Sequence, residues 1–197
     1  MKKFDWRNIR LRKVSIEDLN DRLLLINLYA TQAITLVIGL IIVYLQKNND
    51  LHLFDLSAGW IIVVWGGLFA GLVLLADVFA GRWVPEEVTD DGGINQMLFE
   101  NRPLWHIAVI SLIVAVCEEI LFRGAVQHAI GPYWTSIVFA AVHVRYLKHW
   151  IMTGLVFSIS YGLGWIYIRT GTLLTPILAH FIIDFVMGSI IRFRRES

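Results

Sequence analysis

The segment "ISLIVAVCEEILFRGAV", residues 110–126, is apolar except for two adjacent glutamates, an arginine and a serine. It belongs to a mostly apolar run over about residues 104–129, which is long enough to cross a ~30 Å hydrocarbon core as a helix. Ionisable side chains inside such a span are costly and tend to mark functional positions. The segment therefore predicts a membrane helix that carries a site.

The composition of the whole chain is that of a membrane protein. Of its 197 residues, 57% are hydrophobic and 17% are charged, against about 45–50% and about 25% in a typical soluble domain. We expect an all-α, polytopic transmembrane helical bundle within the lipid bilayer. About six spans are predicted, over residues 23–45, 58–80, 104–129, 133–146, 150–168 and 173–191, with a short interfacial helix at 94–99.

The distribution of basic residues predicts the orientation of this bundle. With the N-terminus in the cytoplasm, fourteen Lys and Arg residues fall on the inner side of the membrane and two on the outer side, as the positive-inside rule requires. The expected organisation is a cytoplasmic segment (1–22), a bundle (23–191) and a basic cytoplasmic tail (192–197). The net charge of +1 makes no case for a nucleic-acid partner.

Helix geometry separates the two glutamates of the opening segment. At 100° per residue, Arg123 lies about 40° around the helix from Glu119 and about 140° from Glu118. Glu119 and Arg123 are therefore predicted to form an i,i+4 ion pair. Glu118 points about 100° away from Glu119 and has no partner on its own helix, so we expect the chemistry at Glu118.

Three further polar residues lie in apolar spans: His143, His180 and Asp184. The last two are four residues apart, so Asp184 can orient His180. Glu118, His143 and His180 are expected at similar depth, where Glu118 could activate a water and His180 could stabilise an oxyanion. The same residues could instead hold a divalent metal, relay protons in a transporter, or form structural ion pairs.

Small residues at four-residue spacing occur in two of the predicted spans. They are Gly67 and Gly71 in one span, and Gly154, Ser158 and Gly162 in the other. Small side chains let membrane helices approach closely. Both sets are predicted to be packing ridges.

Three motifs in this sequence resemble those of the CAAX proteases and bacteriocin-processing enzymes, the CPBP or Abi family. Glu118-Glu119-Ile-Leu-Phe-Arg123 matches the family's EExxxR motif, and Phe139-Ala-Ala-Val-His143 matches its FxxxH motif. His180-Phe-Ile-Ile-Asp184 matches the third motif, in which the last residue is Asn or Asp. All three occur in family order on separate predicted helices, within about residues 100–190.

The resemblance implies an intramembrane endopeptidase similar to the type II CAAX prenyl endopeptidases. Glu118 and His143 become the pair that activates water, His180 becomes the oxyanion donor, and Glu119 with Arg123 becomes the supporting pair. The implied partner is a membrane-associated peptide or protein substrate, and the implied location is a bacterial plasma membrane. An ionised Asp184 cannot donate to an oxyanion, so it is expected to be protonated, to orient His180 or to help bind a metal.

Two alternatives remain open at this stage. One is a non-catalytic immunity or scaffold protein of the same family that keeps the motif residues for packing. The other is a metal-dependent protease, with zinc or another divalent ion bound by Glu118, His143 and His180. We expect no cofactor, because the glutamate mechanism implied by the resemblance needs no metal.

Overall fold

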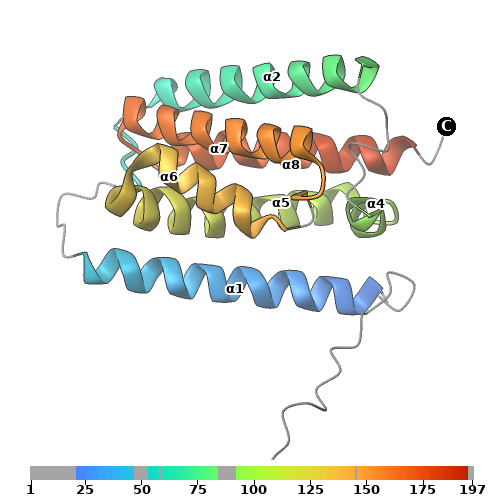
Figure 1. Ribbon diagram of the computed structural model, residues 1–197, viewed down its shortest axis with the longest axis horizontal. Helices are drawn as coiled ribbons and strands as arrows, with labels where there is room; N and C mark the ends of the chain where they lie inside the picture. Colours follow the sequence, from blue (N-terminus) through green and yellow to red (C-terminus); the bar gives the residue numbers. More distant parts are fainter. Residues whose placement is uncertain (1–20, 47–52, 58, 84–91, 145, 195–197) are drawn as a thin grey trace, which may run out of the picture.

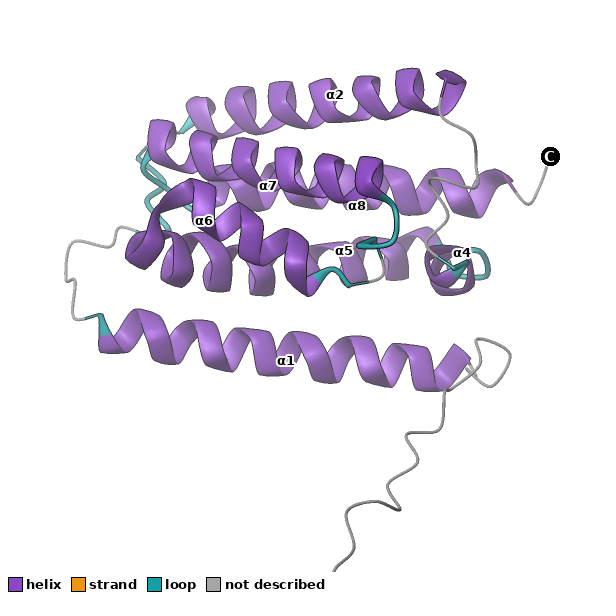
Figure 2. Ribbon diagram, viewed as in Figure 1, coloured by secondary structure: helices purple, strands orange, loops and turns teal. Residues whose placement is uncertain are grey.

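The computed structural model of this chain describes residues 21–46, 53–57, 59–83, 92–144 and 146–194. All regular structure among these residues is helical (Figure 2). The elements are α1 (Asp21–Leu45), α2 (Trp60–Trp83), α4 (Ile94–Phe99), α5 (Leu104–Glu119), the π-helix η3 (Ile120–Val126), α6 (Gln127–Val142), α7 (Trp150–Thr170) and α8 (Leu174–Arg194). The predicted short helix at 94–99 and the all-α class are confirmed.

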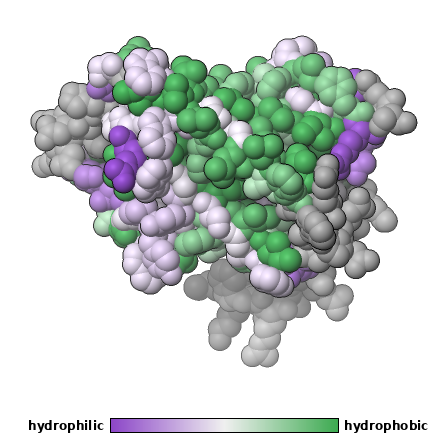
Figure 3. Space-filling view, turned by 90° about the horizontal axis from the view of Figure 1, so that it is seen from above, coloured by the Kyte–Doolittle hydropathy of each residue, from purple (hydrophilic) through white to green (hydrophobic). Residues whose placement is uncertain are grey.

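Five helical stretches among the described residues are long and apolar enough to cross a membrane. Their outer surfaces are apolar as well, because α1 and α2 expose many large hydrophobic side chains. In Figure 3, apolar residues cover the middle of the face on the side of α2, and hydrophilic residues lie toward its ends. An apolar band of this kind matches a bilayer, so the chain is an integral membrane protein with a polytopic helical bundle.

The third of these stretches, Leu104–Val142, spans 39 residues and reverses direction at Gly131. Gly131 has φ 76° and ψ 169°, a conformation that is almost exclusive to glycine, and Pro132 follows it. The rings of Phe122 and Phe139 lie 4.7 Å apart, whereas a straight helix would separate them by about 26 Å. Residues 132–142 are therefore a short return arm of about 16 Å, which ends at His143.

The bundle places α1 and α2 at opposite edges, with the other helices between them (Figure 1). Helix α8 packs against both α2 and α5, α6 packs against α7 and η3, and α1 packs against η3 and α5. Helix α1 begins and α8 ends at the same end of the bundle. An Arg102–Asp21 ion pair and a bond from Arg192 Nε to the Arg102 carbonyl (3.1 Å) connect these helices there.

The interior of the bundle is unusual because its largest fully buried side chain is an arginine, Arg123. Two apolar clusters surround the centre, one around Ile120 and Leu173 and the other around Leu163 and Ile166. A charged residue in such an interior requires partners. The helices at the centre of the bundle supply them.

Candidate active site

The predicted ion pair between Glu119 and Arg123 is present and fully buried. Arg123 Nη1 donates to Glu119 Oε1 at 3.1 Å, and both side chains have 0% exposure. Arg123 Nη2 also donates to the carbonyl (2.8 Å) and hydroxyl (3.0 Å) oxygens of Ser160 on α7. The guanidinium lies 5.2 Å from the centre of the Phe139 ring. These contacts connect η3, α6 and α7 through a single side chain.

His180 joins this buried pair to α8. Its Nδ1 lies 2.8 Å from Glu119 Oε1, and its Nε2 lies 3.4 Å from Asp184 Oδ2. An ionised carboxylate only accepts hydrogen bonds, so a ring protonated on both nitrogens satisfies both neighbours. In that state the charges of Glu119, Arg123, His180 and Asp184 sum to zero. The contact to Asp184 is long for a hydrogen bond, so the Nε2 proton is held loosely.

Glu118 lies on a different side of the helix from Glu119 and is half-buried. Its Oε1 accepts a hydrogen bond of 3.2 Å from Nε2 of Gln32, which lies on α1. Gln32 was not among the predicted site residues, although an amide in the apolar run 23–45 is a detectable signal. Among the described residues no basic side chain forms an ion pair with Glu118.

His143 stands at the C-terminal end of α6. Its Nδ1 lies 2.7 Å from the Phe139 carbonyl oxygen, and its ring stacks on the Phe139 ring at 4.4 Å. Because a carbonyl oxygen only accepts, the proton must be on Nδ1. In the tautomer with its proton on Nδ1, the ring presents Nε2 as a hydrogen-bond acceptor, and no described residue bonds to that nitrogen.

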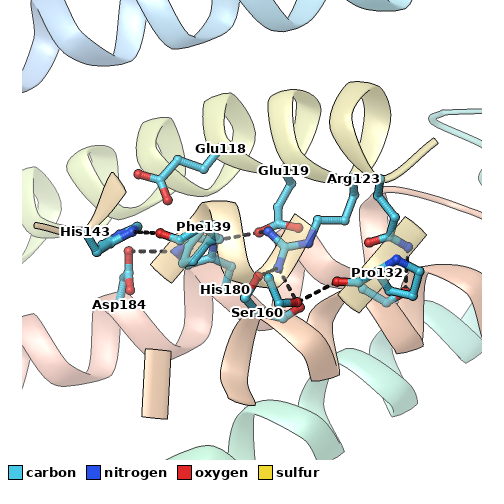
Figure 4. Close-up of polar contacts among 12 residues, drawn as sticks. Glu118, Glu119, Arg123, Pro132, Phe139, His143, Ser160, His180 and Asp184 are labelled. Carbon is cyan, nitrogen blue, oxygen red and sulfur yellow. Dashed lines mark hydrogen bonds and ion pairs between the residues drawn. The ribbon is translucent and has the colours of Figure 1, made fainter. Parts of the chain in front are cut away.

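The side-chain exposures divide the cluster drawn in Figure 4 into a buried side and an accessible side. Glu119 and Arg123 occupy the buried side, while Glu118 points toward the end of the cluster where His143 and Asp184 lie. The Asp184 side chain is 32% exposed. Asp184 is about 15 Å from either end of α8, and Glu118 is about 21 Å from the start of α5. The accessible carboxylates therefore lie well inside the bundle.

The residues of the alternative metal set do not form a metal site within the described part of the chain. Among the residues that the structure describes, no group of three or more His, Cys, Asp or Glu side chains is placed to hold a metal ion. Both nitrogens of His180 already face carboxylates.

The fold and the network define a polytopic membrane bundle with ionisable side chains at its centre, and such side chains mark a functional site by default. The family model "Type II CAAX prenyl endopeptidase Rce1-like" matches residues 100–186. The chain is 45% identical over 132 residues to the uncharacterized protein YpbD of Bacillus subtilis (strain 168). The aligned region covers 66% of this chain and 70% of that relative. No solved structure matches the chain significantly. The chain belongs to the Rce1-like family.

Proposed function

We propose that this protein is an intramembrane endopeptidase in which Glu118 and His143 activate a water molecule. The carboxylate of Glu118 is half-buried, and one of its oxygens is engaged by Gln32. The tautomer of His143 leaves Nε2 as an acceptor. A water that donates one proton to each of these groups presents its oxygen lone pair to a peptide carbonyl carbon. The observation that carries the proposal is that Glu118 points toward the end of the cluster where His143 lies (Figure 4).

The proposed reaction balances without a cofactor. Glu118 takes a proton from the water as its oxygen bonds to the carbonyl carbon, and the carbonyl oxygen becomes an oxyanion. The C–N bond then breaks, and Glu118 returns the proton to the leaving amine. The described residues include no group of three or more His, Cys, Asp or Glu side chains placed to hold a metal ion, and the proposed steps use none.

His180 supplies the proposed oxyanion donor. Its Nδ1 contact with Glu119 (2.8 Å) is short, whereas Nε2 and Asp184 are 3.4 Å apart. Because the contact with Asp184 is long, the Nε2–H can donate to an oxyanion instead of to Asp184. The Asp184 carboxylate still balances the charge of the ring. An aspartate thereby assists at this position without itself donating a hydrogen bond.

The proposed substrate is a membrane-associated peptide or protein, and nucleic acid is not a proposed partner. The accessible carboxylates lie inside an apolar bundle, so the scissile bond must enter the depth of the bilayer. The relative from Bacillus subtilis supports placing this chain in a bacterial plasma membrane.

The test uses purified protein in liposomes with a fluorogenic, farnesylated CAAX peptide. Glu118→Gln and His143→Ala are each expected to reduce kcat by about 10²–10⁴-fold without lowering the thermal unfolding midpoint. His128→Ala, on the exposed part of α6, is the matched control and should keep its activity. Cleavage by Glu118→Gln at the wild-type rate would refute the mechanism.

The non-catalytic alternative makes the opposite prediction for the same proteins. A scaffold would leave every such peptide intact, and Glu118→Gln would change stability alone. Quantifying both cleavage and unfolding for each variant therefore separates an enzyme from a scaffold.

A further inference from the structure

Helix α1 contacts the rest of the bundle through one narrow face. Its only buried residues are Gln32 and Gly39, which are seven residues apart, and Gln46 follows seven residues later. Seven residues are nearly two helical turns, so all three lie on the same face. Many large apolar side chains of α1 outside this face are exposed. The protein-facing side of this membrane helix therefore has polar and small residues beside apolar ones such as Leu36, whereas its lipid-facing side is apolar.

Each of these three residues contacts the segment that carries the site. Gln32 Nε2 donates to Glu118, and Gln46 Nε2 donates to the Ala125 carbonyl at 2.9 Å in η3. A Cβ added to Gly39 would lie 3.0 Å from Leu121 Cα, so the glycine brings the two backbones together. Two contacts therefore dock α1 on η3, and the third reaches Glu118.

The amide of Gln32 is costly where it stands. The side chain is 8% exposed, and its Oε1 is buried without a hydrogen-bond partner among the described residues. A carboxylate only accepts, so Nε2 must face Glu118 and Oε1 must face away. An unsatisfied buried acceptor destabilises a fold. Packing alone would therefore favour an apolar residue at this position.

We infer that Gln32 is a positioning residue that orients the Glu118 carboxylate. The Gln32 amide donates to Oε1 of Glu118, so the second carboxylate oxygen of Glu118 is directed toward the proposed water. This inference rests on the proposed function. Helix α1 lies outside the residues that match the family model, 100–186, so the motifs of that region do not include the contribution.

The test variant is Gln32→Met, which preserves the length of the side chain and removes the donor. Thr31→Val is the control, because Thr31 is exposed and its hydroxyl donates to Asn27 O in its own helix and to no other described residue. Gln32→Met is expected to lower kcat by about 10- to 100-fold, with KM within about twofold. The thermal midpoint should not fall, since an unsatisfied amide has been removed.

Infrared spectroscopy provides a second measurement that does not depend on cleavage. The difference between wild type and Glu118→Gln identifies the carboxylate band of Glu118, and Gln32→Met should shift this band while Thr31→Val should not. The charged and titratable groups around Glu118 are the same in both variants; they are Cys117, Glu119, Arg123, His143, His180 and Asp184. An unshifted band would overturn the inference.

The two proposals fail in different ways. If Gln32→Met shifts the Glu118 band but Glu118→Gln cleaves at the wild-type rate, the Gln32–Glu118 contact is supported and the proposed function is refuted. If the wild type is active, Glu118→Gln is inactive and Gln32→Met has the wild-type kcat, then only the positioning role of Gln32 is refuted. A lowered midpoint with unchanged kcat would assign Gln32 a purely structural role and also overturn the inference.

Discussion

Replacing Arg123 with methionine tests whether its buried network holds the bundle together. The substitution removes the hydrogen bonds to Glu119 and to both oxygens of Ser160, as well as the contact with the Phe139 ring. Methionine fills much of the same space and tolerates irregular surroundings. The main consequence is therefore electrostatic, because Glu119 remains fully buried and, of the residues that the structure describes, only His180 remains as a cationic partner.

The size of the effect follows from this burial. Removing one partner of a buried ion pair costs about 3–5 kcal/mol, because the other charge stays in a low-dielectric interior. A chain of this length changes its unfolding midpoint by about 2–4 °C per kcal/mol. Arg123→Met should therefore unfold about 6–20 °C below wild type.

The chain contains its own reporter for this measurement. It has a single cysteine, Cys117, which is buried at 5% exposure. A fluorogenic maleimide reacts with Cys117 only when the bundle opens, so its fluorescence during heating in detergent gives the midpoint. The cysteine lies beside the two glutamates and therefore reports on the region under test.

Arg169→Met is the matched control. Arg169 also lies over an aromatic ring, at 5.0 Å from the centre of Trp165, but it is exposed at the end of α7. An exposed cation–π contact contributes about 0.5–1 kcal/mol, so this variant should lose less than about 4 °C. Equal losses for Arg123→Met and Arg169→Met would refute the electrostatic reasoning. Adding Glu119→Gln to Arg123→Met should recover part of the loss, since no unpaired carboxylate would remain.

Three further predictions follow from the same geometry. Gly131→Ala should destabilise the fold by about 1–3 kcal/mol, because φ is 76° at this position, and should therefore lower the unfolding midpoint reported by Cys117. Gly154→Ala, in a helix with open space around it, should not lower the midpoint. Gly39→Leu should displace α1 from η3 and reduce kcat in the peptide assay, while Ala33→Leu on the exposed face should keep it. Dialysis against 1,10-phenanthroline should leave the cleavage rate within about twofold, and loss of activity restored by zinc would contradict the metal-free mechanism.

Local rules predicted the parts of this molecule that depend on nearby residues. The apolar runs predicted the long helices, and four-residue spacing predicted the contacts of Glu119 with Arg123 and of His180 with Asp184. These features depend on helix periodicity, which the sequence displays directly. The expected helix over 104–129 was correct in extent, but residues 120–126 form a π-helix, which apolar periodicity does not indicate.

Contacts between distant segments were beyond the same rules. The short contact of His180 is with Glu119, 61 residues away, and no spacing rule reports it. The predicted packing ridges were wrong at Gly67, Gly71 and Gly154, which have open space around them. Of the glycines in these two sets, only Gly162 packs closely, against Phe69. The close helix approach at Gly39 was not predicted. Spacing shows that small residues share a face but not which partner that face meets.

The charges of the described cluster explain why the two glutamates differ. Glu119 is balanced by Arg123 and His180, and Asp184 balances the second charge of that group. Glu118 meets only a neutral amide, and it is the more exposed of the two carboxylates. A fully paired carboxylate is a poor base, because taking a proton would break its ion pairs and leave a buried cation unbalanced. Proton transfer at Glu118 disturbs none of these pairs, so the network can stay rigid while Glu118 changes charge during each proposed turnover.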